Sequence, residues 1–229
     1  NTFITIFYNQ VIGLSNTLIG IAIFVALLVD AITDPLIGII SDNWKSKHGR
    51  RHPFLFAAPI PLALAIYAIF NPPESILNGV DNFTNYVLFA WLASCTIFSR
   101  VFLTLYSIPH LALGGEMSKN HNQRSRLFSA NSAFSYVTGA LFGFLAWGVF
   151  FDGDHIRAVD GMVVPGHLNA ASYAPLILLA CSLVLVAIWT TAAGTYKPAN
   201  RLVIISAARR IAIPSDWLLR RANTCANDY

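Results

Sequence analysis

The chain has 229 residues, of which 55% are hydrophobic and only 11% are Asp, Glu, Lys or Arg. Soluble domains carry about a quarter of such charged residues. The low charge and the mean hydropathy of +0.57 argue against a soluble globular fold and exclude an intrinsically disordered chain. Cys95, Cys181 and Cys225 are too scattered to suggest a disulfide framework or a cysteine metal cluster. The net charge of +4 gives no reason to expect a nucleic-acid partner, because its distribution along an apolar chain matters more than its sum.

Six apolar segments predict an all-α polytopic membrane protein. They cover approximately residues 2–12, 17–40, 54–70, 83–113, 127–151 and 173–194. All but the first are long enough to cross a bilayer, which takes roughly 20 helical residues. The first segment is short and does not begin with Met, so we expect a truncated first helix. A signal peptide fits less well, because the segment has no basic start and no small-residue cleavage site. Residues 1–196 therefore predict a six-helix transmembrane bundle.

The basic residues orient this bundle, because Lys and Arg collect in cytoplasmic loops. All of them except Arg100 and Arg157 lie in the loop after the second segment, in the loop after the fourth, or beyond residue 196. Both termini are therefore expected to face the cytoplasm. For residues 197–229 two interpretations stay open: a basic cytoplasmic tail or linker at the membrane surface, or an out-of-frame extension.

Two acidic residues lie inside the second apolar segment, where an ionised side chain costs at least roughly 2.5 to 3.5 kcal/mol. Asp30 and Asp34 are four residues apart, so a helix places them on one face, about 6 Å apart along its axis. Carboxylate oxygens bind hard cations such as Na⁺, and a proton can neutralise the same groups. The pair is therefore a candidate Na⁺ or H⁺ coupling site. The alternative is that both acids only hold helices together.

Arg100 is a third ionisable residue within a span, near the middle of the fourth segment and close to the expected depth of Asp30. It can form a buried ion pair with one of the two acids, or it can meet an anionic group of a substrate. Thr33 and Ser107 are candidates for completing an oxygen cage around a cation. Hydroxyls in membrane helices often bond to their own backbone instead.

The sequence offers no pattern typical of an enzyme. Its six histidines form no HExxH or other metal-ligand spacing, and no GxSxG, Walker or GxGxxG pattern occurs. We expect no catalytic residues and no cofactor other than a coupling ion.

A family resemblance rests on two segments. VDAITDPLIGIISDNWKSKHGRRHPF, residues 29–54, contains a DAxxDP core, and YSIPHLALGGEMSKNHNQRSRL covers residues 106–127. Both resemble the glycoside-pentoside-hexuronide:cation symporters of the major facilitator superfamily, and with the hydropathy pattern the resemblance covers nearly all of residues 1–196. It implies the N-terminal half of that fold, with Asp30 and Asp34 contributing to a cation site beside a sugar pocket.

A second pattern after Asp34 resembles a stretched form of the superfamily's loop motif, GxxxDxxGRR. Asp42 can pair with Arg50 or Arg51 at the cytoplasmic side and hold helices together in one state. Glu116 can pair with Arg124 or Arg126 after the fourth segment. The alternative is a solvated loop that only sets orientation. These patterns involve the following residues: Gly38, Asp42, Gly49, Arg50, Arg51, Glu116, Arg124 and Arg126.

The sequence departs from the melibiose carriers at positions linked to cargo. Ser107 replaces their fourth-helix acid, Leu111 an aromatic residue, and Ser132 a sugar-binding arginine of the fifth helix. The DAITDP string also resembles the animal sodium-dependent lysophospholipid symporters, so a lipid-like substrate stays an alternative to a sugar or glycoside.

Together these features predict part of a cation-coupled secondary transporter in a bacterial cytoplasmic (inner) membrane. Its expected partners are the lipid bilayer, a small-molecule substrate, and either a missing C-terminal six-helix half or a second subunit. The competing hypothesis is a half-transporter or membrane assembly subunit that transports nothing by itself.

Overall fold

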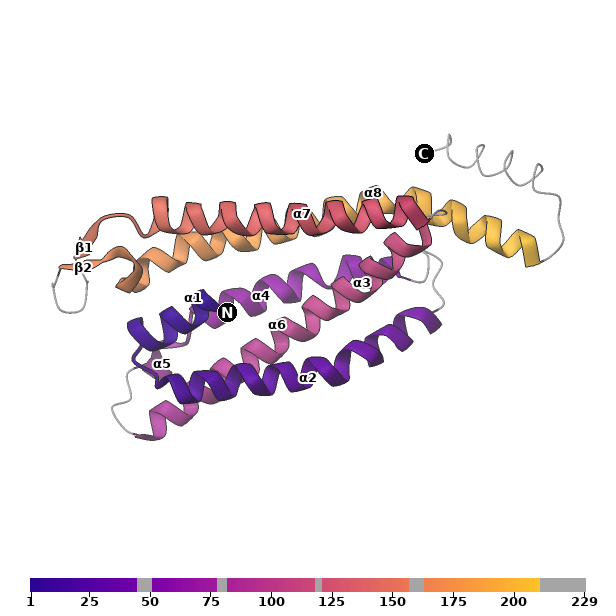
Figure 1. The fold of residues 1–229 in the computed structure, drawn as a ribbon. Helices are drawn as coiled ribbons and strands as arrows, with labels where there is room; N and C mark the ends of the chain where they lie inside the picture. The colour runs from indigo at the N-terminus through magenta and orange to yellow at the C-terminus, as the bar shows by residue number, and fades with distance from the viewer. Residues whose placement is uncertain (45–50, 78–81, 118–120, 157–162, 211–229) are drawn as a thin grey trace.

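A computed structural model of the chain describes residues 1–44, 51–77, 82–117, 121–156 and 163–210; side chains are described over 1–44, 51–77, 84–115, 121–153 and 163–195. Helices dominate, with two π-helical turns, η1 and η2, one 3₁₀ turn, η3, and one short hairpin (Figure 1). In chain order the elements are α1 (Thr2–Ile6), η1 (Phe7–Val11), α2 (Asn16–Asn43), α3 (His52–Ala57), α4 (Pro59–Phe70), α5 (Glu74–Leu77), α6 (Asn82–Met117), α7 (His121–Leu145), η2 (Ala146–Phe150), β1 (Asp154–Ile156), β2 (Val163–Pro165), η3 (Gly166–Leu168) and α8 (Ala170–Arg210).

Five helical stretches of the described residues are long and apolar enough to cross a membrane. They are Asn16–Asn43, His52–Leu77, Thr84–Gly115, His121–Phe150 and Ala170–Thr195. The shorter α1 and η1 precede them in place of the expected first segment. The prediction of an all-α polytopic fold is therefore confirmed, and the protein is an integral membrane protein.

Several helices extend beyond the apolar segments that predicted them. α7 begins at His121, six residues before the expected start at 127, and α8 continues to Arg210, past the expected end at 194. Hydropathy marks only the part of a helix suited to the bilayer. Polar and basic residues with good helix propensity can continue the same helix outside it.

In Figure 1, α7 and α8 lie along one side and α2 along the other, with α3 and α4 between them, and α6 crosses obliquely from the side of α2 toward α3. α6 packs against α2 on one flank and α4 on the other, and α4 also packs against α8. α7 contributes little to the core: almost none of its apolar span is buried. The central helix α6 therefore holds together the layer that contains α2.

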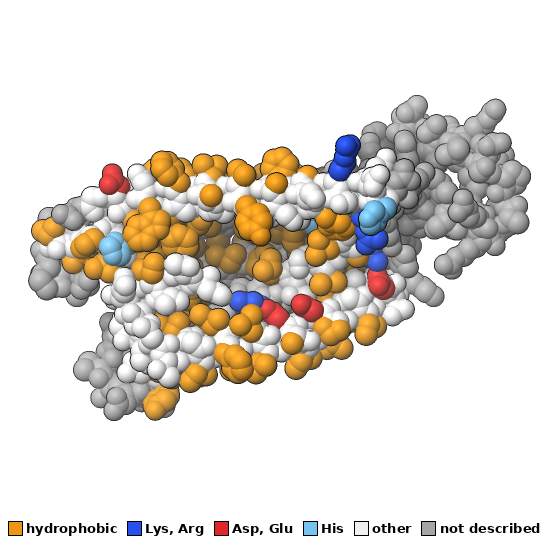
Figure 2. Space-filling view, viewed as in Figure 1, with side chains coloured by type: hydrophobic (Ala, Val, Ile, Leu, Met, Phe, Trp, Pro, Cys, Tyr) orange, Lys and Arg blue, Asp and Glu red, His pale blue; other side chains and the backbone are white. Residues whose placement is uncertain are grey.

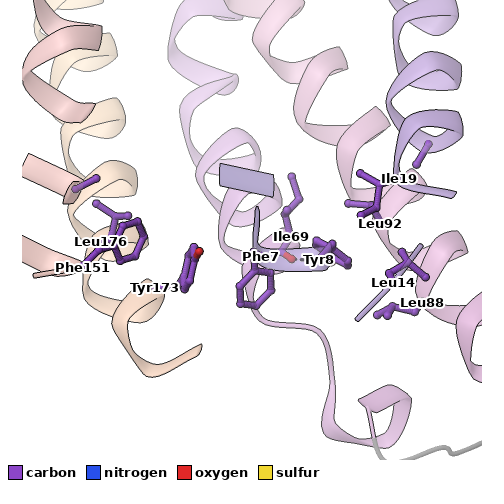
Figure 3. Close-up of a cluster of buried hydrophobic side chains, with 12 residues drawn as sticks. Phe7, Tyr8, Leu14, Ile19, Ile69, Leu88, Leu92, Phe151, Tyr173 and Leu176 are labelled. Atoms are coloured by element: carbon purple, nitrogen blue, oxygen red, sulfur yellow. Dashed lines mark hydrogen bonds between the residues drawn. The ribbon is translucent and has the colours of Figure 1, made fainter. Parts of the chain in front are cut away.

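The main hydrophobic core lies at the end of the bundle opposite the basic loops, where η1, α4, η2 and α8 meet (Figure 3). Phe7 contacts the rings of Phe70 and Tyr173, at centroid distances of 5.3 and 4.9 Å, and Phe151 lies 4.8 Å from Tyr173. The buried hydroxyl of Tyr8 donates a hydrogen bond of 2.7 Å to the Ile69 carbonyl. These contacts attach η1 to α4 and α8.

A sharp turn connects this cluster to α2. Gly13 has a φ of +90°, a backbone conformation that side chains with a Cβ rarely adopt. The Leu14 amide donates to the Tyr8 carbonyl at 2.8 Å, and the Ser15 side chain accepts from the Leu18 amide at the start of α2. The turn thus fixes where α2 begins, and with it the depth of Asp30 and Asp34.

We predict that Phe7→Ala lowers the free energy of unfolding of the detergent-solubilised chain by about 3–5 kcal/mol, because it removes a ring from the centre of this cluster. Denaturant or thermal unfolding followed by circular dichroism measures the change. The matched control is Phe134→Ala on α7, whose side chain is 73% exposed; it should change the value by no more than about 0.5 kcal/mol. Equal losses for the two variants would contradict a core centred on Phe7.

Candidate functional site

The candidate site lies between α2 and α6, which run parallel and in register. Asp30 of α2 contacts Arg100 of α6. Eight residues further along both helices, a Cβ placed on Gly38 would lie 3.8 Å from Cγ2 of Ile108. Because the same spacing separates the two contacts on each helix, residues of α2 lie level with those seventy positions later on α6.

Asp30 and Arg100 form an ion pair in the middle of these helices. Arg100 Nη1 donates to Asp30 Oδ2 at 2.6 Å, and each side chain is only 20% exposed. The other oxygen, Asp30 Oδ1, is buried and has no hydrogen-bond partner among the described residues. Arg100 thus forms a short charge-assisted bond with one oxygen of the Asp30 carboxylate, Oδ2, and leaves Oδ1 without a partner among the described residues.

Asp34 differs from Asp30 although it is one turn away on the same face of α2. It is partly buried, and within the described part of the chain its side chain takes part in no ion pair or hydrogen bond. The following residue, Pro35, lies inside the helix and has no N–H to donate to the Ala31 carbonyl. Carboxylate and carbonyl oxygens are thus available within one turn of α2, and these are the ligands that hard cations prefer.

Thr33 and Ser107 lie near this pair in different ways. The Thr33 hydroxyl donates to the Asp30 carbonyl at 3.4 Å, so it is engaged with its own helix. Ser107 is partly buried on α6, and the register places it about 4.5 Å further toward the basic loops than Asp34. It stays a candidate ligand at the inner edge of the site.

Two further residues of α6, Thr96 and Thr104, were missed by sequence reasoning. They lie one turn before and one turn after Arg100, and they are only 2% and 6% exposed. Thr96 Oγ1 has no hydrogen-bond partner among the described residues. Their spacing of four residues on either side of Arg100 was the signal that could have found them, because it places all three polar side chains on one helix face.

Figure 2 shows that the molecule is hollowed between the layer of α7 and α8 and the layer of α2 and α6. Acidic and basic side chains lie at the edge of this hollow, on the side of α2 and α6, whose central charged residues are Asp30, Asp34 and Arg100. Apolar side chains cover much of the remaining visible face. The charges are therefore placed at a cavity and not scattered over the surface that lipid covers.

At the basic end of the bundle, Arg51 pairs with Asp42. Arg51 Nη2 lies 2.5 Å from Asp42 Oδ1, and the Arg51 side chain is 10% exposed against 56% for Asp42. The pair ties the end of α2 to the start of α3. Arg50, the other predicted partner of Asp42, lies outside the described residues.

The second predicted pairing at this end involves α6 and α7. The Glu116 side chain lies outside the described residues. The Arg124 guanidinium lies over the Phe128 ring, with its Cζ 5.7 Å from the ring centroid, and 3.2 Å from where a Cβ on Gly115 would be. Arg126 is exposed. Arg124 thus packs α7 against the last turns of α6.

On α7, which corresponds to the fifth apolar segment, the uncharged Ser132 stands where the melibiose carriers have a sugar-binding arginine. Ser132 is exposed and lines an open groove on α7 together with His121, Arg124, Ser125, Phe128 and Ser129. Leu111, at the position of an aromatic residue in those carriers, is 43% exposed. A solute held in this groove would meet the Arg124 guanidinium and the His121 imidazole as well as serine hydroxyls and the Phe128 ring.

Within the described residues, no group of three or more His, Cys, Asp and Glu side chains could hold a metal ion. A Na⁺ ion at Asp30 and Asp34 would need further oxygens, from carbonyls, hydroxyls or water.

Comparison with known proteins decides the family. The profile of the family described as "MFS/sugar transport protein" matches residues 1–205. The chain belongs to this family of the major facilitator superfamily. The match extends into α8 beyond its apolar part.

Relatives of this major facilitator chain are named symporters and transporters. The uncharacterized symporter sll1374 of Synechocystis is 33% identical over 134 residues, 58% of this chain and 24% of that protein. The putative glycoside/cation symporter YagG of Escherichia coli is 28% identical over 54% of this chain and 25% of that protein. The isoprimeverose transporter of Lactiplantibacillus pentosus is 25% identical over 56% and 25%. The predicted resemblance to glycoside–cation symporters is confirmed.

The matched part of the chain spans only about a quarter of the length of these relatives. No solved structure matches the chain.

We predict opposite effects on stability for the two aspartates. Asp30→Asn and Arg100→Gln should each lower the free energy of unfolding by about 3–5 kcal/mol, because each leaves a charge of the pair uncompensated in a partly buried site. Asp34→Asn should leave stability unchanged or raise it, because it removes a carboxylate that has no partner.

Chemical unfolding of the detergent-solubilised chain measures all three variants. The double variant Asp30→Asn/Arg100→Gln serves as the control, and it should recover at least about 1 kcal/mol relative to the sum of the single losses. Additive losses in the double variant, or a loss for Asp34→Asn as large as that for Asp30→Asn, would contradict the geometry of the pair.

Proposed function

We propose that this chain forms the N-terminal part of a secondary transporter that couples uptake of a small solute, a sugar or glycoside, to the entry of Na⁺ or H⁺. The observation that carries the proposal is a pair of carboxylates inside the membrane-spanning helix α2, of which, among the described residues, only Asp30 is compensated by a cationic side chain. An ionised Asp34 is costly within the bilayer, and no ion pair or hydrogen bond within the described part of the chain offsets that cost.

Coupling follows from the charge of this site. Without a cation, Asp34 carries an uncompensated negative charge beside the hollow between the helix layers. Binding Na⁺ or a proton removes that charge, so that the site can be enclosed at lower electrostatic cost. A carrier in which closure requires this neutralisation moves solute and cation together, and alternates access about a site near the middle of the membrane.

The Asp42–Arg51 pair is proposed to act at the cytoplasmic gate. It joins α2 to α3 at the end that carries the basic loops. Because Asp42 is more exposed than Arg51, water and a neighbouring helix can compete for it during a conformational change. Arg50, Glu116, Arg124 and Arg126 are proposed to contribute to the same gate. Both termini are proposed to lie in the cytoplasm, and the bacterial origin of the relatives supports an inner membrane.

The proposed solute class is supported by the family and by the names of relatives, which include a putative glycoside/cation symporter and an isoprimeverose transporter. A further six-helix half, or a second subunit, is proposed to supply the opposite wall of the cavity. A lipid-like solute stays the alternative.

The proposal is tested by uptake into membrane vesicles that contain the protein expressed from its complete gene. A panel of labelled pentosides, hexosides and uronides is offered with and without an inward Na⁺ or H⁺ gradient. We expect gradient-driven uptake that an ionophore abolishes and that Asp34→Asn reduces by at least about tenfold, because the cation site is lost. Asp30→Asn should reduce uptake as well.

The matched control is Glu74→Gln, which removes an exposed acid of α5 far along the chain from the site. It should leave uptake unchanged. Gradient-driven uptake that survives both aspartate variants would contradict the coupling role. Uptake by the 229-residue chain alone, at the rate of the complete protein, would instead support a half-transporter that assembles with a second copy.

A further inference from the structure

The three charged side chains at the centre of α2 and α6 do not balance one another. Asp30 and Asp34 each carry one negative charge when ionised, and Arg100 carries one positive charge at any physiological pH. The group is therefore left with a single negative charge. The same two carboxylates without a neighbouring arginine would leave two negative charges.

The geometry assigns the positive charge of Arg100 to one carboxylate oxygen. Nη1 of Arg100 binds Oδ2 of Asp30 at 2.6 Å, whereas a guanidinium placed for both oxygens would form two parallel bonds. Asp30 Oδ1 is buried without a partner among the described residues. It lies on the same helix face as Asp34, which is one turn away. Asp30 Oδ1 and the Asp34 carboxylate thus both lack a partner among the described residues and lie within one turn of α2, as two ligands of one small cation would have to.

We propose that Arg100 is a resident counter-cation, which replaces one of the two external cations that a pair of buried carboxylates would otherwise take up. The site then accepts one monovalent cation per cycle, at Asp34 and the unpartnered oxygen of Asp30. This proposal rests on the proposed function, and it determines the ion stoichiometry of that function. Arg100 is not a receptor for an anionic solute, because its guanidinium is held by Asp30.

The surroundings of Arg100 fit a fixed position. Thr96 and Thr104 flank it by one turn on each side and are almost fully buried. α6 is packed against both α2 and α4, so the arginine extends from a helix that is held on two sides. Displacing it from Asp30 would leave two charges without compensation in a site of low exposure, which is costly.

The experiment counts the positive charge that the protein takes up, and it needs no knowledge of the solute. The protein expressed from its complete gene is purified in detergent. Bound ²²Na⁺ is measured by equilibrium dialysis, and protons taken up on acidification are measured by potentiometric titration. The difference between each variant and the wild type isolates the site from the other titrating groups, and the two readouts distinguish Na⁺ from H⁺.

We expect the wild type to take up one cation charge at the site and Arg100→Gln to take up two, because both carboxylates then need external compensation. Asp30→Asn/Arg100→Gln removes one charge of each sign and should return the count to one. Arg100→Lys keeps the positive charge and should also give one. The last two variants keep the test valid if Arg100→Gln alone does not fold, because any count other than one in them contradicts the proposal.

An unchanged count in a folded Arg100→Gln variant would overturn the role of Arg100 while leaving cation coupling intact. Loss of uptake of anionic solutes alone, with that unchanged count, would assign Arg100 to solute binding instead. A wild type that takes up no cation charge at the site would defeat the proposed function itself, and the inference with it.

Discussion

The bilayer offers no water to compensate a charge, so each ionised side chain within it must find its compensation inside the protein. The arrangement of α2 and α6 satisfies this constraint for two of three charges. Asp30 and Arg100 meet because the two helices run in the same direction and pack against each other, with Gly38 facing Ile108 eight residues further along. Asp34 is uncompensated among the described residues, and this imbalance gives the site its proposed chemistry.

The two ends of the bundle are held by different forces. At the end away from the basic loops, aromatic rings of η1, α4, η2 and α8 form a dry cluster, which fixes the turn at Gly13 and the start of α2. At the basic end, the Asp42–Arg51 pair joins α2 to α3 in a more exposed setting. The stability of packed apolar rings does not depend on ionic strength. An ion pair with an exposed partner, here Asp42, is screened by salt and can exchange partners. The second end is therefore better suited to change during a transport cycle.

The sequence was sufficient for the fold class and for the family, because long apolar segments and the DAxxDP core are strong signals. It also placed Asp30 and Asp34 on one helix face. It could not determine which acid Arg100 meets, since that depends on the register of two helices seventy residues apart. It missed Thr96 and Thr104, because a threonine in an apolar span is common, and only their spacing of four residues on either side of Arg100 distinguishes these two. The lengths of α7 and α8 were underestimated, because hydropathy indicates which part of a helix lies in the membrane and not where the helix begins and ends.

The central claim is that Asp34, and not Asp30, is the carboxylate that an external cation neutralises. Infrared difference spectroscopy of the purified protein tests this directly, because a protonated carboxyl group has a C=O stretch that an ionised carboxylate lacks. We predict that acidification in the absence of Na⁺ produces carboxyl bands of which Na⁺ suppresses one component, and that Asp34→Asn removes this Na⁺-sensitive component. A Na⁺-sensitive component of undiminished intensity in Asp34→Asn would contradict the account.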